Sequence, residues 1–284
     1  MLQTMKKVVF IILSAVVLLI VLSSCSSKID STEQLMEQIS DKYNGKWFKQ
    51  IKFCQTTSFY KNDSIIKTER WIEEYKYPSQ LIIKVNHENS SDGHLYRNDS
   101  VYIFEDNEIK YQNKATHDLV ILSMDIYNMK KDEIMKRLSG LDYDLNKFHE
   151  DNYNGRKIYV IGADKGDNKT NQLWFDAENL YFIKLTKNTD IGLQEIYLNE
   201  YINIEGQGWI EQEVVFVING EVNIVEKYYN IEIPQESIPE INVNDFSKFK
   251  LDLNNKIKYF INFDYSTHGK GLLILFYDNI SYII

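Results

Sequence analysis

Alternation of apolar and polar side chains with a period of two runs through most of the sequence and restricts the fold more than any other feature. It starts in WFKQIKFCQTTSFY (residues 47–60) and is still present in VNIVEKYYNIEI (residues 222–233). Such a period places successive side chains on opposite faces of a β-strand. Turn-forming pairs separate the alternating segments and favour antiparallel hairpins. These pairs are Asn62-Asp63, Asn98-Asp99 and Asn219-Gly220.

Three other segments have the spacing of a helix, with apolar residues recurring every three or four positions. They are residues 31–43, 116–129 and 131–140. In the first of them, Ser31 or Thr32 can cap the helix, and Leu35, Met36 and Ile39 then fall on one face. Strands before and after a helical middle predict an α+β domain, in which an antiparallel sheet carries helices on one face.

The N-terminus has the pattern of a secretory signal. Two lysines precede an apolar run over residues 8–22, which ends in LSSC at Cys25. The run is shorter than the roughly 20 residues of a membrane-spanning helix. LSSC resembles the lipobox of bacterial lipoprotein signals, which implies a signal peptide over residues 1–24, acylation of Cys25 and a tether over residues 25–30. The alternative is an uncleaved anchor helix.

An acylated Cys25 predicts a membrane as the first partner of the protein. Ser26 directly after it is compatible with sorting to the outer membrane, so we expect a lipid-anchored protein of the cell envelope that faces the periplasm. The formal charge of −9, with no block of basic residues, argues against a nucleic-acid partner.

The loop GADKGD (residues 162–167) raises the question of a phosphate or metal site. Strand-like segments lie on both sides of it, so no helix N-terminus points at a ligand. We therefore interpret it as a hairpin corner, with a loose surface cation at Asp164 and Asp167 as the alternative. The next hairpin is predicted to turn at residues 176–179.

No other segment has the pattern of a catalytic or metal-binding site. The five histidines are scattered without metal-binding spacing. With Cys25 acylated, Cys54 has no disulfide partner, and its strand-like surroundings predict a small core residue. We therefore predict no catalytic residue, no metal and no cofactor, and keep a hydrolase as the least favoured hypothesis.

Four segments together resemble the LolA/LolB-like lipoprotein-carrier superfamily. The first half of the pattern is a strand that begins at Pro78, followed by a Ser-Asp-Gly hairpin and an aromatic strand. The second half is a turn that begins with Asp between two aromatic strands, followed by one further strand. The segments are YPSQLIIKV (77–85), SDGHLYRNDSVYIFE (91–105), LWFDAENLYFIKL (173–185) and EIYLNEYINIE (195–205). The resemblance covers roughly residues 44–232.

The resemblance implies a curved, unclosed antiparallel β-sheet, a half-barrel, with helices across its concave face. It also implies an apolar cavity between them that holds acyl chains or another hydrophobic ligand. Eleven side chains are candidates to line it, and a plain hydrophobic core is the alternative for the same residues. The candidates are Ile51, Phe53, Trp71, Tyr75, Leu81, Ile83, Leu122, Ile126, Met129, Trp174 and Phe182.

The chain departs from the soluble carriers, which have an arginine before the proline where this sequence has Tyr77. We therefore predict a membrane-tethered, non-catalytic protein that binds an apolar ligand, such as the acyl chains of a lipid or lipoprotein. The alternative is a structural or assembly lipoprotein that docks an envelope protein through its sheet. The domain is expected to span residues 31–250. The apolar tail over residues 251–284 is either a last buried strand or sequence foreign to the domain.

Overall fold

The computed structural model describes residues 28–248. The predicted signal peptide, the acylation site Cys25 and the tail over residues 251–284 lie outside this range. No helix in the described part of the chain is both long and apolar enough to cross a membrane.

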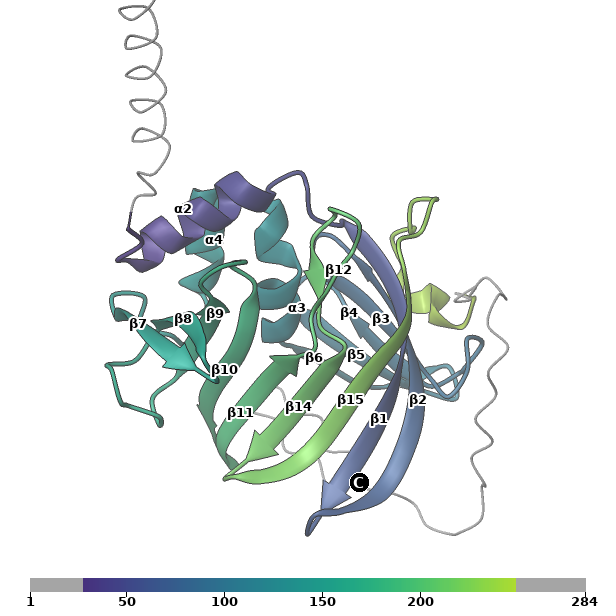
Figure 1. The fold of residues 1–284 in the computed structure, drawn as a ribbon. Coiled ribbons are helices and arrows are strands. Elements are labelled where there is room, and N and C mark those ends of the chain that lie inside the picture. The colour runs from purple at the N-terminus through teal and green to yellow at the C-terminus, as the bar shows by residue number, and fades with distance from the viewer. Residues whose placement is uncertain (1–27, 249–284) are drawn as a thin grey trace, which may run out of the picture. The chain divides into compact units, whose positions relative to one another are not determined.

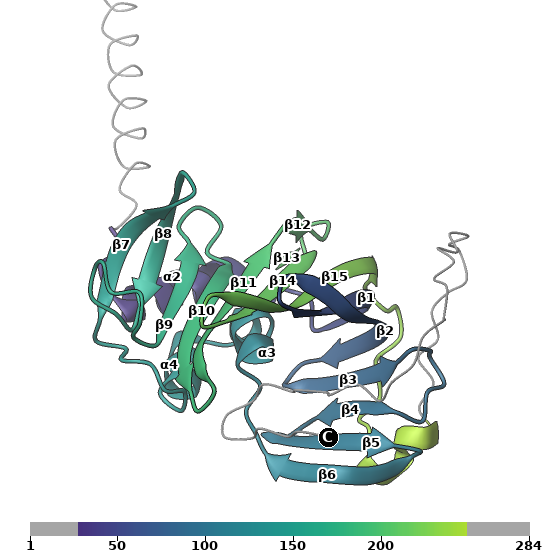
Figure 2. The ribbon, with the colours of Figure 1, turned by 90° about the horizontal axis from the view of Figure 1, so that it is seen from below.

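One antiparallel sheet of thirteen strands dominates the fold (Figure 1). Its order is β6-β5-β4-β3-β2-β1-β15-β14-β11-β10-β9-β8-β7, and the two end strands do not pair with each other. The sheet is strongly curved but unclosed (Figure 2), which confirms the predicted α+β half-barrel. The strands are β1 (Gln50–Lys61), β2 (Ser64–Lys76), β3 (Gln80–Val85), β4 (Gly93–Tyr96), β5 (Ser100–Glu105), β6 (Glu108–Lys114), β7 (Phe148–Tyr153), β8 (Arg156–Ile161), β9 (Gln172–Asp176), β10 (Phe182–Thr189), β11 (Gly192–Asn199), β14 (Glu213–Ile218) and β15 (Glu221–Glu232).

The sheet consists of two arms built from local hairpins. The N-terminal arm holds β1 to β6 and the C-terminal arm holds the remaining seven strands. Among the strands of residues 28–248, the β1–β15 ladder alone pairs one arm with the other. A separate two-stranded hairpin, β12 (Ile202–Asn203) and β13 (Trp209–Ile210), follows β11. The three predicted turn pairs connect β1 to β2, β4 to β5 and β14 to β15, with positive φ at both residues of each pair. That conformation matches the twist of a tight hairpin and suits Asn, Asp and Gly.

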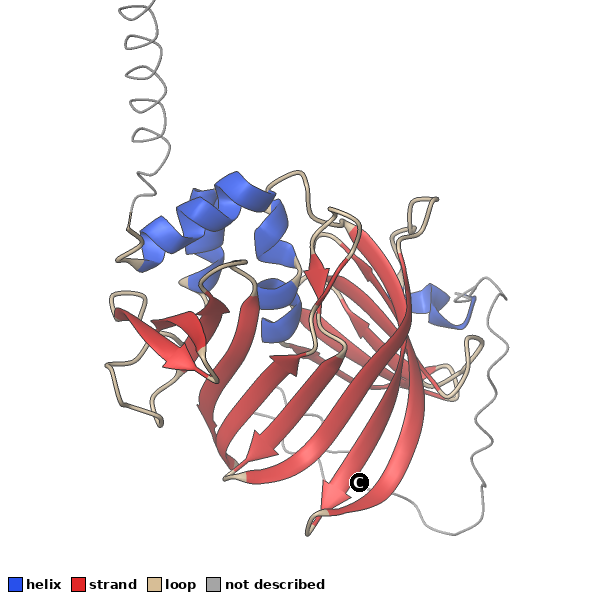
Figure 3. Ribbon diagram, in the orientation of Figure 1, coloured by secondary structure: helices blue, strands red, loops and turns tan. Residues whose placement is uncertain are grey.

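The helical elements between residues 32 and 138 gather on one side of the sheet (Figure 3). Ser31 caps the first of them, accepting a hydrogen bond from the N–H of Gln34 (3.2 Å), and Leu35, Met36 and Ile39 are fully buried on its inner face. The segment over residues 116–129 is helical as predicted, but it divides into two short pieces. The helices are α2 (Thr32–Tyr43), α3 (Asp118–Ser123), the 3-10 turn η1 (Asp125–Asn128) and α4 (Lys131–Leu138).

The division between α3 and η1 comes from a buried carboxylate. The backbone of Met124 leaves the helical region (φ −128°, ψ −57°), and Asp125 turns toward the sheet. Its carboxylate accepts hydrogen bonds from the Tyr75 hydroxyl (2.6 Å) and from the N–H (3.0 Å) and hydroxyl of Ser79. Asp125 is fully buried, so these bonds replace the water it loses. They fix η1 against the turn between β2 and β3, where Pro78 lies.

The opposite face of the N-terminal arm, here called the back face, is covered by the segment after β15. This C-terminal strap, residues 233–248, ends in the 3-10 helix η2 (Val243–Lys248). Its Phe246 stacks on Phe104 at 3.9 Å, within an apolar cluster that also contains Cys54. Cys54 is thus a small buried residue, as predicted.

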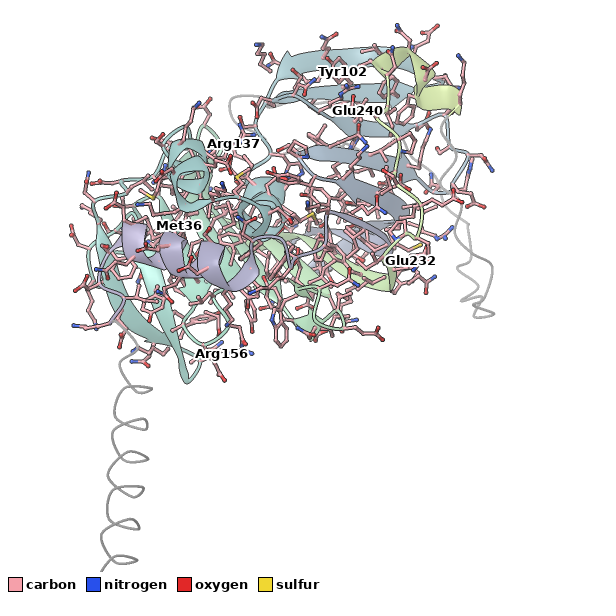
Figure 4. All side chains as sticks on the ribbon, turned by 90° about the horizontal axis from the view of Figure 1, so that it is seen from above. Met36, Tyr102, Arg137, Arg156, Glu232 and Glu240 are labelled. Atoms are coloured by element: carbon pink, nitrogen blue, oxygen red, sulfur yellow. The ribbon has the colours of Figure 1, made fainter. Side chains whose placement is uncertain are left out.

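Polar side chains hold the strap in place. The Lys84 ammonium donates to the carbonyls of Ser90 (2.9 Å) and Phe246 (2.8 Å), and lies 3.5 Å from the centre of the Phe246 ring. The side-chain amide of Gln80 pairs with the strap backbone, and Glu240, labelled in Figure 4, pairs with Arg97 (2.9 Å).

Candidate functional site

Six of the predicted lining residues lie on the helix-facing side of β1, β2 and β3. The strand register aligns them in rows across the sheet, because Ile51 is opposite Tyr75, which is opposite Leu81. Tyr75 contacts η1, so this row faces the helices. All six are 0–5% exposed. They are Ile51, Phe53, Trp71, Tyr75, Leu81 and Ile83.

The three helical candidates differ in how deeply they are buried. Leu122 and Ile126 are fully buried, whereas Met129 is half-buried at the end of η1. Phe182, on β10, is also fully buried, and its N–H donates to the hydroxyl of Tyr127 in η1 (2.7 Å). These contacts bring residues of both arms and of the helical segment together.

Trp174 lies on the opposite face from Phe182. It is paired across the strands with Lys184, whose ammonium lies 4.3 Å from the Trp174 ring and 4.5 Å from the Tyr197 ring. Lys184 also forms a salt bridge to Glu195 (2.7 Å). This half-buried ladder is separate from the other candidates, and we leave Trp174 out of the proposed lining below.

An aromatic cluster that the sequence did not single out connects α2, η1 and β10. Trp47 stacks on Tyr127 with ring centres 3.9 Å apart and meets Tyr43 edge-on at 4.8 Å. Tyr201 stacks on Tyr181 at 3.9 Å. These side chains come from segments far apart in the chain, so no local period marks them.

Gly208 allows the β12–β13 hairpin to approach this aromatic cluster. A Cβ at this position would lie 2.4 Å from the Trp47 ring, and the backbone has φ +107°. Both facts require glycine.

A group of buried hydrogen-bond acceptors lies next to the apolar rows. We call Gln55, Glu73, Glu211 and Glu226 the acceptor cluster. Gln55 on β1 is opposite Tyr228 on β15, and Thr57 is opposite Glu226, so these side chains share the helix-facing side. Glu73 on β2 is opposite Phe53 on the same side. All four members of the cluster are at most 8% exposed.

Burial dominates the electrostatics of this cluster. It raises the pKa of Glu211 to about 7 and that of Glu226 to about 7, and it raises the pKa of Glu73 well above its usual range. Repulsion from the neighbouring carboxyls raises the pKa of Glu73 further. The group therefore holds protons near neutral pH that exposed glutamates would have lost.

The GADKGD loop is the corner between β8 and β9, as predicted. Its carboxylates are occupied within the protein: Asp167 accepts from the N–H groups of Lys169 (2.8 Å) and Thr170 (3.1 Å), and Asp164 pairs with Lys147 (2.6 Å). No group of three or more metal-ligating side chains was found within residues 28–248. The next hairpin turns after Asp176, whose side chain accepts from the N–H groups of Glu178 and Asn179.

Comparisons with known proteins give structural neighbours only. No protein-family model and no curated protein matches the chain. One neighbour is a DUF1329 family protein from Desulfovibrio piger, with 10% identity over 77% of this chain and 98% of that chain and a TM-score of 0.48.

The names of two other neighbours refer to LolA or to lipoprotein sorting. One is a LolA superfamily protein from Nitrosomonas europaea, with 13% identity, coverage of 74% and 96%, and a TM-score of 0.44. The other is a domain described as an outer membrane lipoprotein-sorting protein from Vibrio parahaemolyticus, with 12% identity, coverage of 76% and 96%, and a TM-score of 0.49.

Proposed function

We propose that the protein is a lipid-anchored envelope protein that binds an apolar ligand, such as acyl chains, between its sheet and its helices without catalysis. The observation that carries the proposal is the row of apolar side chains on the helix-facing side of an unclosed sheet. A closed barrel would surround this surface with strands, whereas here the two end strands leave the sheet open. Mostly apolar sites with a few placed polar groups are typical of ligand-binding proteins.

The proposed lining contains ten of the predicted residues. The anchor proposed at Cys25 would hold this surface near a membrane, where acyl chains are abundant. Binding would rest on burial of apolar area, which contributes roughly 25 cal/mol per Å2 removed from water. The lining residues are Ile51, Phe53, Trp71, Tyr75, Leu81, Ile83, Leu122, Ile126, Met129 and Phe182.

Native mass spectrometry tests this function directly. The chain from Ser31 onward would be purified from a bacterial host without detergent and examined for copurified lipid, which would then be extracted and identified. We expect a stoichiometric acyl-bearing species. Replacement of Ile83 by Asp should abolish it, whereas the exposed Ile66→Asp serves as the matched control. A clean apo mass, together with no uptake of a fluorescent fatty acid, would refute the proposal and direct attention to protein partners.

A further inference from the structure

Once its carboxyls are ionised, the acceptor cluster has more hydrogen-bond acceptors than donors. The Gln55 amide N–H group donates to the Thr57 hydroxyl (2.8 Å) and contacts Glu226, and the Tyr228 hydroxyl donates to Glu226 (3.3 Å). The indole N–H of Trp71 is directed to Glu69 instead (2.8 Å). These three donors therefore already have partners within the protein.

Gln55 leaves one acceptor without a partner. The side chain is fully buried, and its carbonyl oxygen Oε1 accepts no hydrogen bond. Its amide nitrogen is held by Thr57 and Glu226, so Oε1 belongs to the same cluster. A buried acceptor without a donor destabilises the folded protein. A donor from a bound molecule would remove this penalty.

The ionised cluster also lacks a counter-charge. Within residues 28–248, no lysine or arginine pairs with Glu73, Glu211 or Glu226. On this face of the C-terminal arm, Lys187 is paired with Asp118 (3.0 Å) instead. Buried carboxyls normally have a cation or a full set of donors.

Aromatic rings border the same place. Phe53 stacks on Tyr228 with ring centres 4.5 Å apart, and both rings share the face with Gln55. The faces of aromatic rings attract cations. Acceptors, uncompensated carboxyls and ring faces all favour the same partner, a positively charged hydrogen-bond donor.

We propose that the acceptor cluster binds the ammonium group of an amine-bearing amphiphile, whose chain lies along the apolar rows. Glu73, Glu226 and the carbonyl oxygen of Gln55 accept from the ammonium, while Phe53 and Tyr228 border it. This inference deepens the proposed function and rests on it, because the chain of the amphiphile occupies the apolar lining.

Photo-crosslinking with matched probes tests the inference on the full chain in lipid nanodiscs. The probes are a primary amine, an alcohol and a carboxylic acid on the same diazirine-bearing twelve-carbon chain. Crosslinked peptides are mapped by mass spectrometry, which separates labelling inside the protein from partition into the bilayer. We expect the amine to label peptides of β1, β2 and β15 roughly ten- to a hundredfold more than the other two probes, the usual effect of hydrogen bonds to a charged group.

The double variant Glu73→Gln/Glu226→Gln should lose the amine preference and keep the labelling by the alcohol. Glu232→Gln, on β15 but on the back face beside Lys52, is the matched control and should keep the preference. Equal labelling by all three probes, or a preference that persists in the double variant, overturns the ammonium site and leaves the proposed function standing. Absence of labelling by every probe in these strands overturns both.

Discussion

Replacement of Glu211 by Gln should make the protein more stable at alkaline pH. Burial raises the pKa of Glu211 to about 7 in the folded protein, against a usual value of 4.5. Between these two pH values the folded chain holds a proton that the unfolded chain has released. Folding therefore takes up a proton, and the stability falls as the pH rises through this window. Below pH 4.5 both states are protonated, and the penalty vanishes.

The size of the effect follows from the same two pKa values. The rise from 4.5 to about 7, at about 1.4 kcal/mol per pKa unit, corresponds to about 3 kcal/mol at pH 8. Glutamine has nearly the same shape and carries no charge, so Glu211→Gln should be about that much more stable than the wild type at pH 8 and nearly equal to it at pH 4.5.

Urea unfolding followed by tryptophan fluorescence at pH 4.5, 6, 7 and 8 measures the difference. The chain from Ser31 onward is suitable, and Glu221→Gln, an exposed residue of the β14–β15 turn, is the control. Parallel loss of stability in Glu211→Gln and wild type over this range would refute the reasoning, since it would mean that Glu211 ionises normally in the folded state.

Three further changes test the packing around the site. Asp125→Ala leaves the buried donors of the β2–β3 turn unpaired and should lower the free energy of unfolding by about 3 kcal/mol in urea titrations. Gly208→Ala places a Cβ against Trp47 and should cost about 2 kcal/mol or more, whereas Gly206→Ala, with open space around it, should cost less. Lys84→Met removes two hydrogen bonds to carbonyl groups and should speed limited proteolysis of the C-terminal strap.

Each of these three predictions has a clear contrary outcome. A loss below about 1 kcal/mol for Asp125→Ala would mean that water replaces the carboxylate. Equal losses of unfolding free energy in Gly208→Ala and Gly206→Ala would mean that the contact with Trp47 does not determine the cost. Unchanged cleavage in Lys84→Met, relative to the exposed Lys110→Met, would mean that apolar packing alone holds the strap.

Local patterns in the sequence were sufficient for much of the fold. Alternation and turn pairs located the hairpins because both depend only on neighbouring residues. The helix over residues 31–43 was confirmed for the same reason. The division of the segment over 116–129 was not predicted. The carboxylate of Asp125 accepts hydrogen bonds from Tyr75 and Ser79, a tertiary contact that helical spacing does not reveal.

The candidate site was only partly accessible from the sequence. Alternation within one strand assigned Ile51 and Phe53 to the same face, as the register shows. In LWF, by contrast, three consecutive apolar residues carry no period, so the sequence could not tell that Trp174 lies opposite to its neighbours. The acceptor cluster was missed because glutamates on a strand normally indicate the solvent side. The sequence did contain one signal for the cluster, because Gln55 and Glu73 interrupt an otherwise apolar face.

The single ladder between β1 and β15 has a consequence for the order of folding. Every other pairing in the large sheet joins strands that are close in the chain or within one arm, whereas this one joins Cys54 to Tyr229. Such non-local pairing forms slowly, because the chain loses the entropy of closing a long loop before any contact offsets that loss. Each arm can therefore form first, and the two join last. Pulsed hydrogen exchange during refolding should protect β1–β2 amides before the β1–β15 amides, and simultaneous protection would contradict this order. A chain stopped before Glu221, the first residue of β15, would lack the strand through which the sheet joins its two arms.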